Sequence, residues 1–336
     1  KKLDKIVGYE IIQFPPALGF PKLKGAKLRA AMLWLHSCDF VYVDAVASTL
    51  GIWIHGALLR RDLLAAANHI FAFVEQFRGL RARWWPSARR EFLLMSRIIP
   101  FMTLEFSLKA TSTLFASDAQ GPGESDFEDH GGYGIVATDI SEAQLLQCWS
   151  SSFVPGKAVV KLDGSLGKKF GDRTNLIPTI PFTRLPRSIF DADWTVLAHG
   201  RWKISDHITL GEGRAHFKIL QGLVAQGDTH DTRIIALEDN FAVAASMSKG
   251  RSPAPALNYI VRRRAASSLA ANIVAAVPWI ETSVMPADAA SRLKHGDTAG
   301  APDGSSLPRP DHRPAGAADY GAEVSKGVAA FPVVHH

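Results

Sequence analysis

The sequence is poor in cysteine and has no long uninterrupted apolar run. Its 336 residues include two cysteines, Cys38 and Cys148, which make neither a disulfide framework nor a zinc site. The longest apolar stretch, 265–280, is interrupted by Ser, Asn and Pro and is too short to span a membrane. Residues 1–4 are not followed by an apolar segment, so we expect no signal peptide. These absences favour an intracellular globular protein without a membrane partner.

Acidic residues are scarce in the first third of the chain. Residues 1–110 contain 16 Lys and Arg against 8 Asp and Glu, a net charge of +8, whereas residues 111–336 contain 22 against 24, a net charge of −2. A basic first module suits the binding of a polyanion, and the acids of the second module suit metal chemistry. An ordinary solvated surface has a similar charge, so both interpretations remain open at this point.

The first 110 residues are predicted to form a compact, basic and mainly helical module. Apolar residues recur at helical spacing through most of it, and Pro86 and Pro100 are placed to begin and end a helix. We expect one strand at 6–12, a loop around the prolines at 15–21, and helices at 22–35, 41–59, 61–79 and from residue 86 onward.

From Thr111 the apolar pattern changes to that of a mixed α/β domain extending to residue 293. The predicted order is three antiparallel strands, then helices and strands in parallel crossovers. Residues 294–336 are dominated by small and polar residues and are expected to be a disordered tail. The expected elements are a hairpin over 111–139, a helix over 142–149, strands at 194–204, 232–239 and 272–281, and helices at 209–225, 240–247, 254–271 and from 286.

Four acids occupy special positions in this predicted domain: Asp118 and Asp239 end strands, and Glu212 and Asp288 lie in the first turns of helices. Strand carboxyl ends and helix amino ends gather at one edge of such a sheet. Carboxylates that converge there repel one another unless cations neutralise them. Two Mg²⁺ ions about 4 Å apart can then activate water and stabilise a leaving oxygen. Each acid alone also fits an ordinary turn or helix cap.

The segments around these acids resemble the ribonuclease H domains that follow reverse transcriptases in retroelements, especially the DIRS-like and gypsy-like groups. The similar motifs are T-D-A-S with a Gly-Trp-Gly hairpin, H-I-N-x-x-E-x-x-A, a strand ending in D-N, and N-x-A-D-x-x-S-R. Their counterparts here are ASDA (116–119) with GYG (132–134), HITLGEGRA (207–215), EDN (238–240) and MPADAASR (285–292).

The resemblance implies a ribonuclease H-like sheet with flanking helices, cutting the RNA strand of RNA–DNA hybrids. It implies that the four acids are catalytic ligands of two Mg²⁺ or Mn²⁺ ions. Asp118, Glu212 and Asp239 would hold one ion, and Asp118 and Asp288 would hold the other.

The first module resembles the region between the polymerase palm and the ribonuclease domain of such elements. VGYE (7–10) is similar to the strand after the palm, and VASTLGIWIHGALLRR (46–61) to a thumb helix. This resemblance implies a thumb or connection module, a palm upstream in the same polyprotein, and a chain that is an internal piece. A Y-x-D-D polymerase motif is absent, and we interpret Asp44 as a helix cap or surface acid.

Several departures from the family pattern favour an alternative. The loop over 119–131 is longer than the family's turn, Met285 stands where Asn is expected, and Gly211 and Gly213 weaken the helix around Glu212. Asp126 or Asp129 would be less favoured replacements for Asp118, and three loop acids would crowd the ions (Glu124, Asp126 and Glu128). The alternative is a decayed retroelement copy that binds nucleic acid and cuts nothing; a third hypothesis is another nuclease or an integrase on the same fold.

Further candidate nucleic-acid contacts are basic and aromatic. Trp84 and Trp85 could stack on bases or sugars, or simply anchor a helix. Arg262 and Arg263, in a run of three arginines, could follow phosphates, and Arg251 lies in the basic turn after the third acid. The run equally fits a solvated helix face, so both alternatives stay open.

Overall fold

The computed structural model describes residues 5–122, 130–152, 185 and 187–293. The chain forms two compact units. Unit 1 consists of Lys1–Ala110, Gln226–Arg233 and Ser246–Val274, and unit 2 of Thr111–Ala225, Ile234–Ala245 and Ala275–His336. The chain thus leaves unit 1 at the predicted boundary after residue 110, and two later segments return to it. That 1–110 and 111–293 are domains in their own right stays a prediction, and the predicted tail lies outside the described residues.

Unit 1 opens with short antiparallel strands: β1 (Lys5–Ile6), β2 (Tyr9–Ile12), β3 (Ala17–Gly19) and β6 (Thr103–Glu105), in the order β1-β2-β3-β6. The strand predicted over 6–12 is broken at Val7 and Gly8, whose φ angles of 50° and 81° make a two-residue hairpin turn. The proline-flanked segment expected to be a loop contains β3 instead.

The remainder of unit 1 is mainly helical, as predicted, around a core that includes Trp53, Phe73 and Phe92. The helix predicted over 61–79 is interrupted near Asn68, because the Glu91 carboxylate accepts the backbone N–H groups of Asn68 and Ile70. The elements are α1 (Lys22–Ser37), β4 (Phe40–Tyr42), α2 (Val43–Ala57), the 3-10 helix η1 (Arg61–Ala66), α3 (His69–Gln76), β5 (Arg81–Arg83), α4 (Pro86–Arg97), η2 (Ile99–Phe101) and α10 (Pro255–Ala270).

The sheet of unit 2 is built from β7 (Lys109–Gln120), β8 (Gly132–Asp139), β9 (Thr195–Arg201), β10 (Thr232–Leu237) and β11 (Val274–Ala276). The spatial order is β11-β10-β7-β8-β9, and β7, β8 and β9 pair antiparallel. Beyond β10, Glu238 bridges Trp279 in parallel. The predicted mixed α/β class, with antiparallel strands first, is confirmed.

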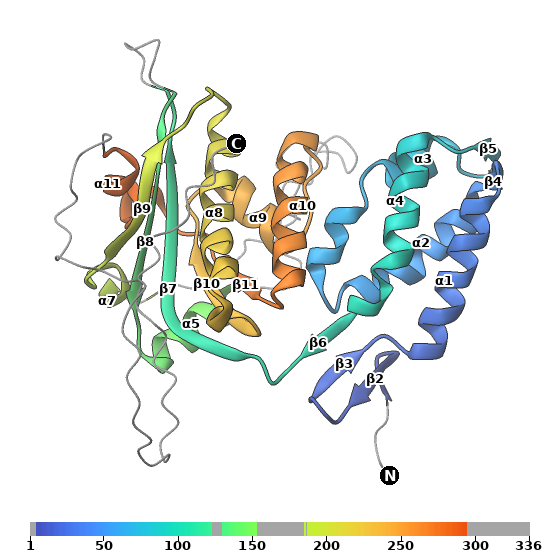
Figure 1. The fold of residues 1–336 in the computed structure, drawn as a ribbon, viewed down its shortest axis with the longest axis horizontal. Coiled ribbons are helices and arrows are strands. Elements are labelled where there is room, and N and C mark those ends of the chain that lie inside the picture. The colour runs from blue at the N-terminus through green and yellow to red at the C-terminus, as the bar shows by residue number, and fades with distance from the viewer. Residues whose placement is uncertain (1–4, 123–129, 153–184, 186, 294–336) are drawn as a thin grey trace, which may run out of the picture. The chain divides into compact units, whose positions relative to one another are not determined.

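Helices cover both faces of this sheet (Figure 1). Tyr133 of β8 faces α8 (Ile208–Ala225), where the Lys218 ammonium lies 4.6 Å from its ring centre. Gly134, which points the other way, faces α11 (Asp288–Ser291). On that second face, apolar side chains of β7, β8 and β10 pack with α5 (Glu142–Ser152), α7 (Arg187–Phe190) and α11.

Three short elements complete the described part of the chain. The helix α9 (Phe241–Lys249) follows β10, and η4 (Gly227–Thr229) and η5 (Thr282–Val284) are single 3-10 turns. Among the residues that the structure describes, no helix is both long enough and apolar enough to cross a membrane.

Candidate metal centre

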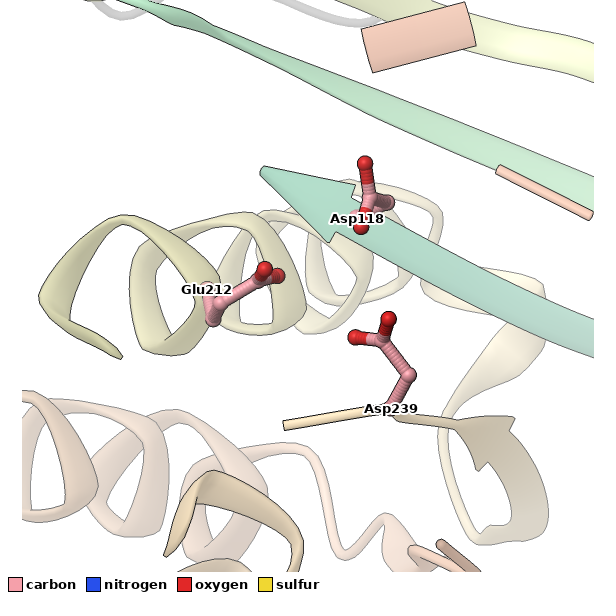
Figure 2. A group of neighbouring side chains, drawn as sticks. All are labelled: Asp118, Glu212 and Asp239. Carbon is pink, nitrogen blue, oxygen red and sulfur yellow. The ribbon is translucent and has the colours of Figure 1, made fainter. Parts of the chain in front are cut away.

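Three acids that are distant in sequence meet in unit 2. Asp118 comes from β7, Glu212 from the second turn of α8, and Asp239 from the residues that follow β10. One carboxylate oxygen of each lies within 4.8 Å of the other two. Figure 2 shows the three carboxylates directed toward a common space. The structure therefore brings together three of the four acids that the sequence singled out.

Burial and mutual repulsion make these carboxylates hard to ionise. Burial raises the pKa of Asp118 to about 6, and the charges of Asp239 and Asp288 act in the same direction. The Ser291 hydroxyl and the Arg292 guanidinium partly oppose this rise. For Asp239, burial again raises the pKa, while a hydrogen bond from Thr282 lowers it.

Glu212 is the most strongly perturbed of the three. Its side chain is 4% exposed, and burial followed by the charges of Asp118 and Asp239 raises its pKa to about 9. The backbone N–H of Ala119 donates to the carboxylate, yet Oε2 is buried without a hydrogen-bond partner. A buried oxygen in this condition is destabilising unless a cation satisfies it.

The residues present fit a divalent cation. Carboxylate oxygens are the donors that Mg²⁺ and Mn²⁺ prefer, and the unsatisfied Glu212 oxygen lies among them. A cation would remove the repulsion that now raises all three pKa values.

Asp288, the fourth acid, is placed differently. It begins α11, and both of its carboxylate oxygens accept hydrogen bonds from Arg292, at 2.6 Å and 3.1 Å. Its charge still raises the pKa of Asp118 and of Asp239, so it lies near the group without belonging to it. Its role as a ligand therefore stays a prediction.

Gly134 allows α11 to approach the site. It is the register partner of Asp118 in the β7–β8 ladder. A Cβ atom at this position would lie 2.5 Å from the backbone nitrogen of Ser291, closer than real Cβ contacts allow. The Gly-Tyr-Gly segment thus serves a close approach of helix to strand beside Asp118.

One residue of the site escaped the sequence analysis. Glu238 is 0% exposed, its Oε1 accepts the Asn240 N–H, and its Oε2 lies 3.6 Å from Nδ1 of His216. Burial, then the charges of Glu212 and Asp239, raise its pKa well above the usual range. No spacing along the chain signals this burial, since Glu238 meets His216 of α8 only through the fold.

The aromatic nucleic-acid candidates pack inside unit 1. Trp84 is 6% exposed, stacks on Phe73 and donates its indole N–H to the Leu35 carbonyl. These contacts favour the helix-anchor interpretation of Trp84, and its stacking on bases stays a prediction. Trp85 is half-buried with its ring against the edges of Phe73 and Phe77, as expected of a helix anchor.

The arginine candidates differ from one another. The Arg262 guanidinium donates to the Ala65 carbonyl and to Glu91, which indicates a structural role, and its contact with phosphates stays a prediction. Arg251 lies over the Phe71 ring at 4.3 Å, and Arg263 is exposed. For these two, contact with nucleic acid stays a prediction. The loop acids Glu124, Asp126, Glu128 and Asp129 lie outside the described residues.

Comparisons with known proteins do not identify a family for this chain, so its function must be argued from the chemistry of the site. No family model matches the chain, and no curated protein matches it. A solved structure of the foamy viral protease-reverse transcriptase in complex with RNA/DNA hybrid aligns at 10% identity with a TM-score of 0.23. The alignment covers 86% of this chain and 51% of that protein, so the chain spans about half of its length. A TM-score this low carries no argument.

Proposed function

We propose that this protein is a metal-dependent nuclease with a ribonuclease H-like domain, which hydrolyses the RNA strand of RNA–DNA hybrids. The observation that carries the proposal is the meeting of three carboxylates with raised pKa values, of which Asp118 and Glu212 are buried and Asp239 is half-buried. Perturbed carboxylates without counter-charges are typical of functional sites and of metal sites. The sheet order and the placement of the acids agree with the resemblance seen in the sequence.

In this proposal the chain's residues hold and orient the reacting groups. Asp118, Glu212 and Asp239 would hold one Mg²⁺ or Mn²⁺ ion, and Asp118 with Asp288 a second. Such ions activate water and stabilise the leaving 3′ oxygen of a phosphodiester. For Asp288 to take part, its carboxylate must exchange the Arg292 guanidinium for the ion. Substrate choice would rest on hybrid shape and on 2′-hydroxyl contacts across the wide minor groove.

The second candidate is a decayed copy that binds nucleic acid without cutting it. The bidentate pairing of Asp288 with Arg292 favours it, because the second ion would then lack one of its two ligands. The nuclease and the decayed copy share the fold and differ in activity, so one assay separates them.

The deciding experiment is cleavage of a 5′-labelled RNA–DNA hybrid in Mg²⁺ and, separately, in Mn²⁺. We expect the parent protein to cut the RNA strand and the Asp118→Asn variant to leave it intact. Asp193→Asn, which removes an exposed acid of the same unit, is the matched control and should cut like the parent. A folded parent that cuts nothing in either metal contradicts the nuclease and favours the decayed copy. Equal cutting of hybrid and of duplex DNA would indicate a nuclease of another class.

A further inference from the structure

Unit 1 contains a cavity of about 630 Å³ among the carboxyl end of α1, the β4–β5 ribbon and the amino end of α4. Binding pockets for small ligands have volumes in the range of about 300–1,000 Å³. Its walls include His36, Arg83, Arg89 and Arg90, with Asp39 as the one acid among the lining residues. The cavity is therefore large enough for a phosphate and its neighbouring sugar, and it is strongly cationic.

The positive charge of the cavity is mostly unneutralised. Asp39 lies 3.7 Å from one nitrogen of Arg89, and its side chain is 79% exposed, so it offsets at most one of the three arginines. Arg83 and Arg90 are exposed. The pKa of His36 is lowered by burial and then by the charges of Arg89 and Arg97, as expected in a positive field. The field favours an anion.

The amino end of α4 adds to this preference. Pro86 begins the helix, the N-cap Trp85 provides no side-chain acceptor, and the first turn has no acid. The first N–H groups and the positive end of the helix dipole therefore lack an internal counter-charge. Arg89 donates Nε–H to the His36 carbonyl at 3.0 Å, which holds its guanidinium in place beside the helix end.

Exposed aromatic side chains adjoin the cavity on the β4–β5 ribbon. Phe40 is the register partner of Arg83, and Tyr42 is the partner of Arg81. The two rings are 52% and 68% exposed, and the Arg81 guanidinium lies 5.8 Å and 5.9 Å from their centres. Phosphate-binding arginines beside exposed rings are the combination that holds a polynucleotide, since bases or sugars can stack while phosphates pair.

We propose that this cavity binds a backbone phosphate of a nucleic acid, with Arg83 and Arg90 as its movable contacts and Arg89 as its fixed one. The inference rests on the proposed function, which requires a nucleic-acid substrate. The ribbon aromatics assign the phosphate to a polynucleotide, because a free phosphate would gain nothing from them.

The test is fluorescence anisotropy of a labelled RNA–DNA hybrid with the full chain in EDTA, where binding is measured without cleavage. Arg83→Ala/Arg90→Ala should raise Kd at least about 10-fold and reduce the slope of log K against log salt by up to about two, since each phosphate contact contributes about 0.9. The matched control is Lys27→Ala/Arg29→Ala, which removes two exposed charges of α1 seven or more residues before His36. It should change Kd less than about 3-fold, whereas equal weakening by both pairs overturns the proposal.

Further measurements distinguish a failure of the nuclease proposal from a failure of the cavity proposal. Inorganic phosphate titrated into the parent should bind far more weakly than the hybrid, and comparable affinity would overturn the polynucleotide assignment. Asp193→Asn, at an exposed acid of unit 2 outside both sites, should bind the hybrid like the parent. A parent that binds but does not cut contradicts the nuclease alone. A parent that cuts while the arginine pair variant binds normally contradicts the cavity alone. Thermal melts of both pair variants establish that they fold.

Discussion

The two units treat buried charge in opposite ways. In unit 1, Glu91 is 5% exposed and receives the backbone N–H groups of Asn68 and Ile70 together with His69 and Arg262. These partners lower its pKa despite the opposing effect of burial. In unit 2, Glu212 is 4% exposed, receives one backbone N–H, and has its pKa raised to about 9. Two glutamates of nearly equal burial therefore differ because of their partners.

The difference indicates which carboxylate is structural and which is poised for a ligand. A buried charge that the chain itself neutralises stabilises one conformation, whereas a group of like charges is stable only with an external cation. Glu91 is of the first kind, and Asp118, Glu212 and Asp239 are of the second. The contrast predicts that a Glu→Gln substitution lowers the free energy of unfolding at Glu91 and raises it at Glu212.

The largest stability effect is expected at Glu91. Glu91→Gln removes the charge that pairs with Arg262 and His69, and breaking a buried pair in this way costs about 2–4 kcal/mol. The measurement is the free energy of unfolding in urea at pH 7. Glu75→Gln, at an exposed position of α3, is the control and should be near neutral. A Glu91 variant as stable as the parent would mean that the partners contribute little.

The same substitution at Glu212 is expected to act in the opposite direction. In EDTA at pH 8 the folded protein must keep Glu212 mostly protonated, whereas the unfolded chain releases that proton. Glu212→Gln removes this cost and should stabilise the protein by about 1–3 kcal/mol, since one pKa unit corresponds to about 1.4 kcal/mol. It should also reduce hybrid cleavage by more than the roughly 10–100-fold that loss of an outer partner costs at a metal site. Glu142→Gln, an exposed acid of α5, serves as control. Destabilisation by Glu212→Gln in EDTA would remove the contrast between the units.

The pH dependence of the metal-free protein sharpens the comparison further. The folded pKa values of Asp118 and Glu212, about 6 and about 9, lie above the ordinary values of 3.8 and 4.5. The folded protein therefore holds protons that the unfolded chain has released. Stability from these two groups is full below pH 4 and is lost as pH rises toward about 9. Glu91, with its lowered pKa, has the opposite dependence.

Binding of Mg²⁺ should prevent the loss of stability that the metal-free protein shows as pH rises. At pH 8, an ion concentration about 100 times its Kd should add about 2.7 kcal/mol to the parent and little to Glu212→Gln. The measurement is the melting temperature from pH 5 to pH 9, with and without Mg²⁺. If the melting temperature of the parent changes with neither pH nor Mg²⁺, these acids do not bind the ion.

The sequence predicted best where its patterns are long. The strands and helices of unit 2 and their order follow from sustained periodicity, as in α8, and the same holds for α10 of unit 1. The strands β3, β4 and β5 were missed because three residues carry no period and their pairing comes from distant partners. The ladder that joins β4 to β5 spans some forty residues of chain and has no local signature.

At the site, the motifs predicted the gathering of Asp118, Glu212 and Asp239 but not the state of the other acids. The pairing of Asp288 with Arg292 was visible as an i, i+4 spacing, but the competing ligand role took precedence in the sequence analysis. Glu238 was overlooked beside its neighbour Asp239, since only the fold shows that it is fully buried near His216. Burial, which decides the role of each acid, is a property of the fold.

Because α10 belongs to unit 1 but follows segments of unit 2 along the chain, the two units are expected to evolve together. Arg264 of this helix is 2% exposed, and its guanidinium pairs with Asp62 at 3.0 Å. A recombination event that exchanged everything after residue 110 would remove Arg264 and leave the retained Asp62 without this buried partner, which destabilises unit 1. Selection must then act on Asp62 and Arg264 together. The two parts are interleaved along the gene and are expected to have evolved as one piece, not as exchangeable cassettes.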